Sequence, residues 1–213
     1  MTFMLFEDRK EAGKRLAKKL MAEAEGQEGI VLAIPRGGIV VGKEISQKLN
    51  FPLDVLVTKK IPAPQNPELA IGAVGEGGIV FFDENLCQNL CVTPAYKRKI
   101  IEEKKKELED KKNFFRKGKP PLDLKDKTVI LTDDGVATGA TMLAAVRVVK
   151  TQKPKEIIVA VPVVALDTLP KLQAEADKVI YLEAPEMFFA VGQFYEKFNQ
   201  VTDEEVLKIL NFK

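Results

Sequence analysis

Five short apolar runs constrain the fold of this chain more than any other feature of its sequence. Each run is apolar at consecutive positions, as expected for strands of a parallel sheet that is buried on both faces. Patterns typical of helices lie between most of the runs. This alternation predicts an α/β fold with a doubly wound, mainly parallel five-stranded sheet. The predicted strands are Ile30–Ile34, Leu53–Val57, Val129–Leu131, Ile157–Val164 and Val179–Leu182.

The helical patterns complete a single-domain architecture. Helices are predicted over Gly38–Leu49, Thr138–Lys150 and Asp167–Ala176, each directly after a strand. An amphipathic pattern near Glu7–Glu25 predicts a further helix that packs on the sheet. A chain of 213 residues has the length of one sizeable domain, so we expect residues 1–213 to fold as one unit.

A long insertion separates the second and third predicted strands. Its first part, residues 59–82, is rich in glycine and proline, which predicts a flexible loop or hairpin without a long regular element. Within it, Ala73–Val74 and Ile79–Phe82 flank Gly75-Glu76-Gly77-Gly78 and are suited to pair as a hairpin.

The second part of the insertion, residues 84–120, is predicted to be a helical arm. Its main helix begins at Thr93-Pro94, an N-cap followed by the first helical position, and runs to about Lys117. Residues 94–117 are strongly basic, with only a narrow apolar stripe. Two interpretations stay open: a solvated charged helix, or an arm that attracts phosphorylated ligands or RNA.

Composition excludes several classes of chemistry. The chain has no histidine and two cysteines, Cys87 and Cys91, which argues against a zinc site and excludes catalysis by Ser-His-Asp or Cys-His groups. Catalysis must then use carboxylates, lysines, backbone amides or a metal that arrives with a ligand. A net charge of +2 is too small to indicate a nucleic-acid partner for the chain as a whole.

The sequence also leads to expectations about location. No apolar run approaches the length of a membrane span, and the first residues lack the pattern of a signal peptide. We therefore expect a cytoplasmic protein without a membrane partner.

The segment Val129–Thr141 carries the most specific chemical information. An apolar run stops at two adjacent carboxylates, Asp133 and Asp134, and a loop of glycine, threonine and alanine precedes the next helix. Carboxylates accept hydrogen bonds from sugar hydroxyls, and the amides at a helix N-terminus favour phosphate. The segment therefore suits a phosphorylated sugar, although an ordinary capped strand-to-helix turn is the structural alternative.

This segment resembles the signature of the type I phosphoribosyltransferases, which bind phosphoribosyl pyrophosphate (PRPP). The resemblance implies that Asp133 and Asp134 hold the ribose hydroxyls and that the following loop wraps the 5-phosphate. Gly135 departs from the family pattern, which usually has a bulky aliphatic residue there. The implied loop residues are Gly135, Val136, Ala137, Thr138, Gly139, Ala140 and Thr141.

Two cationic segments follow the first two predicted strands, and the carboxyl ends of parallel strands meet at one edge of a sheet. The first segment, Arg36-Gly37-Gly38, resembles the family's pyrophosphate loop. That loop often contains a non-proline cis peptide bond, which is a cis bond that precedes a residue other than proline. The second, Lys59-Lys60, is similar to the basic stretch of adenine phosphoribosyltransferases. The resemblance implies that both segments bind pyrophosphate and that Lys59 contributes to catalysis.

The resemblance also implies a flexible loop over the reaction centre, here residues 61–78. Such a loop would shield the ribosyl centre from water. Glu68 and Glu76 are the acids available there for proton exchange with the incoming base. The alternative for both is a surface carboxylate.

The acceptor is the least defined part of the predicted reaction. The 6-oxopurine enzymes carry an aspartate at the position of Ala137, which disfavours that substrate class by its usual route. In contrast, Pro185–Gly192 resembles the segment of hypoxanthine-guanine enzymes that stacks a phenylalanine on the purine. Phe188 or Phe189 would be that base platform, with a core role as the alternative.

The whole pattern, from Glu7-Asp8-Arg9 to the Phe-Phe-Ala-Val-Gly segment, looks most like bacterial and archaeal phosphoribosyltransferases of unassigned substrate. The resemblance implies transfer of the phosphoribosyl group from PRPP to a nitrogen nucleophile, a nucleobase or a related heterocycle, with Mg²⁺ carried by PRPP and no direct protein ligand. Family members are commonly homodimers. The alternative is a regulator that senses PRPP or a nucleotide with the same fold.

Overall fold

The structure is a computed structural model that describes residues 5–24, 26–116, 120 and 122–210. Its central feature is a five-stranded sheet in the order β2-β1-β6-β7-β8, in which every pair of neighbouring strands is parallel. The predicted α/β fold class is therefore confirmed. The strands are β1 Gly29–Ala33, β2 Leu53–Val55, β6 Thr128–Thr132, β7 Glu156–Val163 and β8 Lys178–Glu183.

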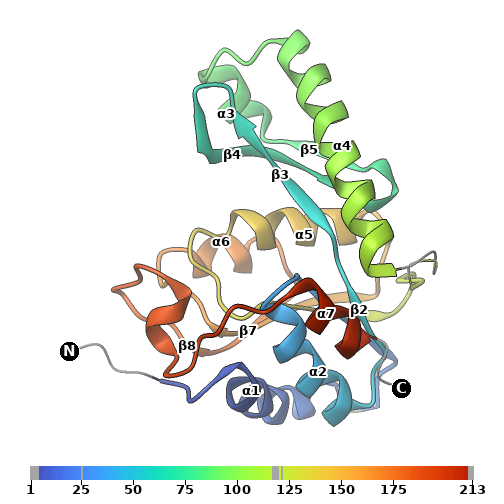
Figure 1. The fold of residues 1–213 in the computed structure, drawn as a ribbon, viewed down its shortest axis with the longest axis vertical. Coiled ribbons are helices and arrows are strands. Elements are labelled where there is room, and N and C mark those ends of the chain that lie inside the picture. The colour runs from blue at the N-terminus through green and yellow to red at the C-terminus, as the bar shows by residue number, and fades with distance from the viewer. Residues whose placement is uncertain (1–4, 25, 117–119, 121, 211–213) are drawn as a thin grey trace.

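Helices cover both faces of this sheet, which explains why its strands are apolar at consecutive positions (Figure 1). In β6, Val129 and Leu131 pack into one buried cluster, whereas Ile130 packs into the cluster on the opposite face. Because side chains alternate across a strand, both sets of positions must be apolar. The lower layer contains α1 Arg9–Ala24 and α2 Gly38–Leu49, and the upper layer contains α5 Ala140–Lys150 and α6 Leu169–Gln173.

One strand is shorter than predicted. The prediction extended the second strand to Val57, but β2 ends at Val55. The amide of Val57 donates to the Glu76 carboxylate at 3.1 Å rather than to a neighbouring strand. The chain leaves the parallel sheet at this point and enters the insertion.

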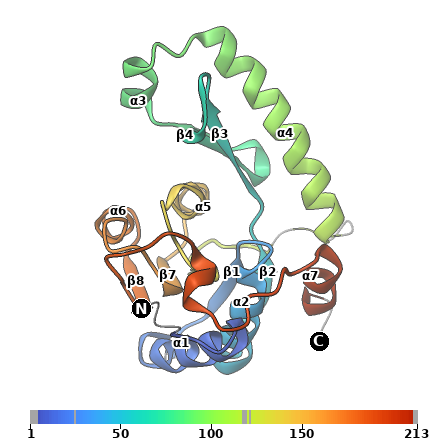
Figure 2. The ribbon, with the colours of Figure 1, turned by 60° about the vertical axis from the view of Figure 1, so that its left-hand side comes forward.

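The insertion, residues 58–116, forms a structure that we call the arm (Figures 1 and 2). It stands above α5 and contains a three-stranded antiparallel sheet in the order β3-β4-β5 together with two helices. In Figure 2, α4 runs from the tip of the arm down to the C-terminal helix α7. The elements of the arm are β3 Thr58–Ala63, β4 Asn66–Gly75, the 3₁₀ turn η1 Glu76–Gly78, β5 Val80–Phe82, α3 Glu84–Asn89 and α4 Pro94–Arg116.

The prediction that residues 59–82 contain no long regular element is wrong, because β4 alone has ten residues. The prolines are tolerated where ladder hydrogen bonds are not required. Pro62 lies on the edge strand β3 at a shift in register, and Pro67 precedes the part of β4 that pairs with β5. The smaller predicted hairpin is confirmed, since Val74 pairs with Val80 and Ala73 with Phe81.

The arm helix contacts the rest of the molecule along one narrow seam. Ile100, Leu108 and Phe115 are buried, while much of the remaining surface of α4 is exposed. This arrangement agrees with the narrow apolar stripe in the sequence.

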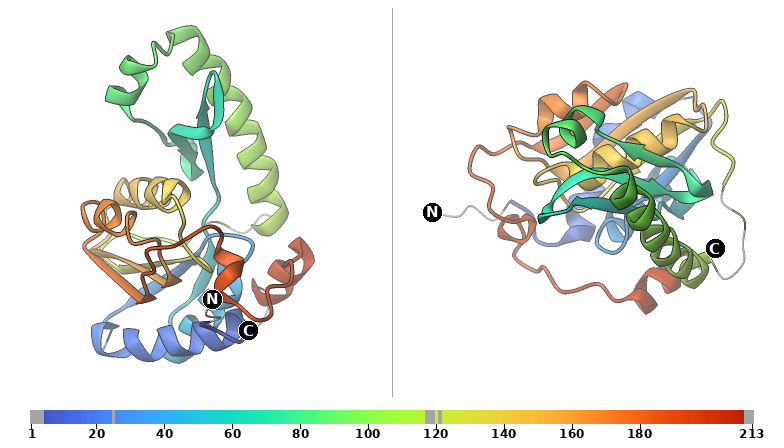
Figure 3. Two further views of the ribbon diagram at one scale, coloured as in Figure 1. Left: turned by 90° about the vertical axis from the view of Figure 1, so that its left-hand side faces the viewer. Right: turned by 90° about the horizontal axis from the view of Figure 1, so that it is seen from above.

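The last elements that the structure describes are η2 Val191–Phe194 and α7 Asp203–Leu210, and neither was predicted. Helix α7 lies beside α2 and the lower end of α4 (Figure 3). Among the described residues, no helix has the length and apolar composition needed to cross a membrane.

Candidate functional site

Two adjacent carboxylates follow directly after β6, at the carboxyl edge of the parallel sheet. Asp133 Oδ1 accepts a hydrogen bond from the Asp134 amide at 2.8 Å, which turns the chain sharply at this point. Burial and the neighbouring Asp134 carboxylate hold the pKa of Asp133 well above its ordinary value. Hydroxyl donors or a cation at this position would favour the ionised form of Asp133.

Three side chains that were not among the predicted site residues hold Asp134 in place. The Arg9 Nε donates to Asp134 Oδ2 at 2.7 Å, and the Arg9 guanidinium lies 3.7 Å from the centre of the Phe198 ring. The Tyr195 hydroxyl donates to the Asp134 carbonyl oxygen at 2.6 Å, and burial raises the pKa of this phenol. In the sequence, Arg9 belongs to the Glu7-Asp8-Arg9 pattern that forms part of the family resemblance.

The loop after the acidic pair is fixed by backbone hydrogen bonds. The Val136 amide donates to the Val163 carbonyl at the end of β7, and the Thr168 hydroxyl donates to the Ala137 carbonyl at 2.6 Å. Gly139 has a φ of 77°, a conformation that a residue with a side chain rarely adopts, and α5 begins directly after it. The segment Asp133–Met142 lines a cavity of about 280 Å³ together with Val191. This cavity opens at the N-terminus of α5, where unpaired amides suit an anion.

Gly135, the departure from the family pattern, has a structural explanation. A Cβ atom at this position would lie 2.6 Å from Val191 Cγ1 and 3.0 Å from Val163 Cγ1. The Val191 side chain therefore fills the space in which a bulky residue at position 135 would lie.

The segment after β1 approaches the acidic pair closely. The peptide between Pro35 and Arg36 is cis, which confirms the expectation drawn from the resemblance. A Cβ at Gly37 would overlap Asp134 Oδ2, and a Cβ at Gly38 would lie 2.8 Å from Asp133 Cα. Both positions therefore require glycine, so that the backbone of this segment can lie against the carboxylates.

The two lysines after β2 lie beside the same segment. Lys59 and Lys60 open β3 and line a cavity of about 370 Å³ that also includes Pro35 and Thr141. The structure thus brings both predicted cationic segments to the edge of the sheet that carries the acidic pair. Lys104, Glu107 and Lys111 of the arm helix line the same cavity.

Comparison with known proteins identifies the family to which this site belongs. Residues 6–199 match the family model of the phosphoribosyl transferase domain. The chain belongs to the phosphoribosyltransferase family. A protein of Mycobacterium tuberculosis, whose name assigns it provisionally as a phosphoribosyl transferase, is 37% identical over 207 residues. That alignment covers 97% of this chain and 46% of the relative, so the chain spans about half the length of the curated relatives it matches.

Two solved structures share the fold of this chain. The crystal structure of TT1426 from Thermus thermophilus superimposes with a TM-score of 0.88 at 40% identity, over 97% of this chain and 98% of that chain. The AQ2163 protein from Aquifex aeolicus gives a TM-score of 0.51 at 13% identity, over 83% and 74% of the two chains. The second match is a likeness in fold alone.

The two phenylalanines predicted for base binding lie in different environments. Phe188 packs against Phe194, with ring centres 4.8 Å apart, next to the cluster around Phe6 and Tyr195. Phe189 is 85% exposed. Val191, rather than either phenylalanine, lines the cavity formed by the acidic pair and its loop.

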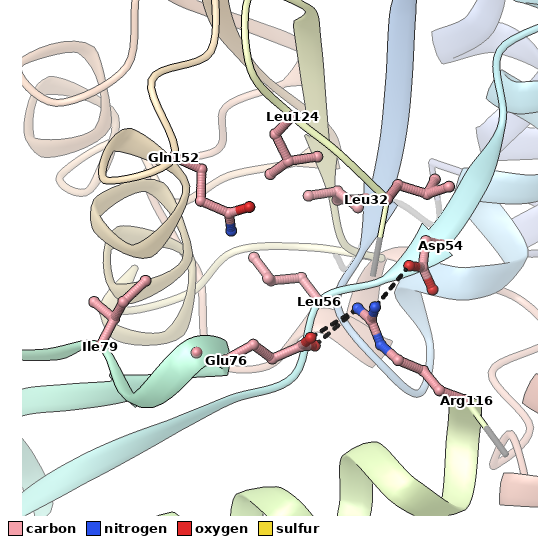
Figure 4. Close-up of a pocket in the computed structure, with 10 residues that line it drawn as sticks. Leu32, Asp54, Leu56, Glu76, Ile79, Arg116, Leu124 and Gln152 are labelled. Carbon is pink, nitrogen blue, oxygen red and sulfur yellow. Dashed lines mark hydrogen bonds and ion pairs between the residues drawn. The ribbon is translucent and has the colours of Figure 1, made fainter. Parts of the chain in front are cut away.

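Glu76, one of the two acids predicted for proton exchange, lies inside the protein (Figure 4). Its carboxylate is 2.9 Å from Arg116, whose guanidinium also lies 3.2 Å from Asp54 and donates to the Val55 carbonyl at 3.0 Å. The alternative of a surface carboxylate is therefore wrong. Burial raises the pKa of Glu76, and the charge of Arg116 opposes that rise.

The cavity beside Glu76 is separate from the cavities of the acidic pair and the lysines. It has a volume of about 280 Å³ and is lined by Leu32, Asp54 and Arg116 among others, and Figure 4 shows the Gln152 amide directed into it. The carboxylate of Glu76 is occupied by a buried ion pair with Arg116, and Arg116 in turn joins the arm to β2 through Asp54 and Val55. The other predicted acid, Glu68, has its backbone in β4, but its side chain lies outside the described residues.

Proposed function

We propose that this protein transfers the 5-phosphoribosyl group from PRPP to a nitrogen nucleophile and releases pyrophosphate. One observation supports the proposal most strongly. The acidic pair, the loop at the start of α5, the Pro35–Arg36 segment and Lys59 meet at one edge of the sheet. The four groups match the diol, the 5-phosphate and the diphosphate of a single ligand.

Each group has a role that follows from its chemistry. Asp133 and Asp134 accept hydrogen bonds from the two ribose hydroxyls. The amides and hydroxyls from Ala137 to Thr141 bind the 5-phosphate at the positive end of the α5 dipole. Arg36, Lys59 and Lys60 stabilise the negative charge that develops on the diphosphate. Gly37 and Gly38 have no side chains, so the diphosphate can approach the backbone of this segment closely.

The acidic pair also fits a magnesium ion carried by the donor. Mg²⁺ prefers oxygen ligands and retains several waters. The pKa of Asp133 is raised, and Arg9 donates to Asp134 rather than to Asp133. A cation bound together with the diol would therefore stabilise the ionised form of Asp133. Bound in this way, Mg²⁺ would neutralise charge on the diphosphate as it leaves.

The reaction exchanges one bond at the ribose C1. The bond from C1 to the diphosphate oxygen breaks, the bond from C1 to the nitrogen forms, and the nitrogen loses its proton. We expect catalysis to come mainly from positioning and from the electrostatic stabilisation of separated charges. Glu68 stays a candidate for the group that takes the proton, and Lys59 for a catalytic cation.

We propose a nucleobase or a related heterocycle as the nucleophile. Ala137 offers no ionisable group beside the loop, which argues against a mechanism with a carboxylate at that position. The exposed ring of Phe189 is free to stack on a planar base, whereas Phe188 is already packed on Phe194. A homodimer stays a prediction. We also propose a cytoplasmic site of action, because a donor with so many charges does not cross a bilayer.

Release of pyrophosphate tests the proposal. The full chain is incubated with PRPP, Mg²⁺ and each member of a panel of purines, pyrimidines and related heterocycles. We expect at least one of them to accelerate pyrophosphate release above the rate without a base, and chelation of Mg²⁺ to abolish the acceleration. Tight PRPP binding without release for any base would instead favour the sensing regulator.

A further inference from the structure

Three charged residues of the arm helix face the site of the proposed diphosphate. Lys104, Glu107 and Lys111 are spaced by three and four residues, which places them on one side of α4. All three line the cavity of about 370 Å³ that is also lined by Pro35 and Thr141 of the main body. The arm therefore closes one side of a cavity that the parallel sheet alone would leave open.

Glu107 bridges two of the lysines that line this cavity. Its Oε2 lies 3.0 Å from Lys59 Nζ at the start of β3, and its Oε1 lies 2.6 Å from Lys104 Nζ on its own helix. The two lysines stabilise the charged carboxylate and lower the pKa of Glu107. In this state, one carboxylate binds two of the cations that a diphosphate would contact.

Lys111 differs from Lys59 and Lys104, which both contact the Glu107 carboxylate. Among the described residues, no carboxylate oxygen lies within 4.0 Å of its ammonium group, and its nearest aromatic contact is the Phe115 ring at 5.8 Å. Burial lowers the pKa of Lys111, and the charges of Lys59 and Arg36 lower it further, against the opposing charge of Asp203. Arg36 and Asp203 are themselves 3.8 Å apart.

The charges around the cavity are unbalanced. Among the described residues that line it, Lys59, Lys104 and Lys111 are accompanied by one carboxylate, that of Glu107. Like charges brought together repel one another unless an anion lies between them. A diphosphate carries more negative charge and more acceptor oxygens than one carboxylate, so it matches this cluster better than Glu107 does.

We propose that Lys104 and Lys111 bind the diphosphate from the arm, and that Glu107 holds Lys59 and Lys104 until the diphosphate replaces its carboxylate. This inference rests on the proposed function, because it extends the diphosphate site of the same reaction. It assigns a role to the basic helix that a merely solvated helix would not have. It also makes Glu107 a competitor of the ligand, so that its removal must strengthen binding.

Titration calorimetry of the full chain with inorganic pyrophosphate and Mg²⁺ tests the inference. K111Q and K104Q should each weaken binding by roughly tenfold, the scale of one hydrogen bond to a charged group. E107Q should tighten binding severalfold. Matched controls on the same helix are K99Q, whose side chain is 79% exposed, and E103Q, its ion-pair partner, and both should bind as the unaltered chain does. Ribose 5-phosphate, which would use the loop before α5, should bind all variants equally.

The outcomes separate the inference from the proposed function. If the unaltered chain binds PRPP but E107Q does not bind pyrophosphate more tightly, or K111Q binds as before, the arm plays no part and the inference is overturned. A K111Q variant that loses pyrophosphate and ribose 5-phosphate equally has an altered fold, which also overturns it. If the chain binds pyrophosphate but not PRPP, and the variants shift as expected, the arm site stands and the proposed function fails. Binding of neither compound refutes both.

Discussion

At the scale of single residues, the site requires glycine at two positions as well as its charged side chains. Gly37 and Gly38 let one backbone segment lie against Asp133 and Asp134, and any larger residue would overlap them. The sequence identified the acidic pair, because two carboxylates after an apolar run are a local signal. It assigned no role to Arg9, which binds Asp134 across 125 positions of sequence. Local patterns carry no information about a contact of that range.

The Gly135 and Val191 pair leads to a prediction at this scale. Changing Gly135 to alanine should lower the free energy of unfolding by about 1–3 kcal/mol, because the new methyl group would overlap Val191 in a well-packed region. Urea unfolding at neutral pH measures the change.

Val191→Ala provides the matched control for this prediction. The double variant G135A/V191A should be destabilised less than the sum of the two single variants, by about 1 kcal/mol or more, because the two side chains share one space. Strictly additive effects would show that Val191 does not exclude a side chain at position 135.

At the scale of elements, the parallel sheet was predictable and the arm was only partly so. The five strands are read from continuous apolar runs, and α2 has the predicted bounds, Gly38–Leu49. Strand β3 and the first part of β4 were missed because Pro62, Pro67 and several glycines interrupt any period of two. Pairing between β3 and β4 overrides this weak local signal, since an edge strand tolerates proline.

The buried ion pairs of Arg116 lead to a prediction for the arm as an element. Arg116→Met should lower the free energy of unfolding by about 3–5 kcal/mol, because Glu76 loses its cation inside the protein and Asp54 loses a nearby charge. Hydrogen exchange should also show faster exchange of the amides in the last turns of α4.

A surface ion pair on the same helix is the control. Lys112 lies 2.6 Å from Glu109, and both side chains are partly exposed, so Lys112→Met should change stability by less than about 1 kcal/mol. Equal effects of the two substitutions would show that Arg116 does not anchor the arm.

At the scale of the whole molecule, function depends on how the arm meets the edge of the sheet. The sequence predicted which segments follow the strands and that they converge, because parallel strands share a carboxyl edge. It did not predict that α4 returns to this edge and places Lys104, Glu107 and Lys111 beside Pro35 and Thr141. That arrangement depends on the antiparallel sheet and on the Arg116 ion pairs, which are contacts between distant parts of the chain.

The central claim is that the acidic pair and its loop bind PRPP. Titration calorimetry with PRPP and Mg²⁺ tests it most directly, on the unaltered chain and on the variant D133N/D134N, with circular dichroism to verify folding. We predict that the unaltered chain binds and that the variant loses roughly a hundredfold or more in affinity, because two charge-assisted hydrogen-bond acceptors are replaced by neutral ones. Equal affinity of the two proteins, or no binding by the unaltered chain at millimolar PRPP, would contradict the claim.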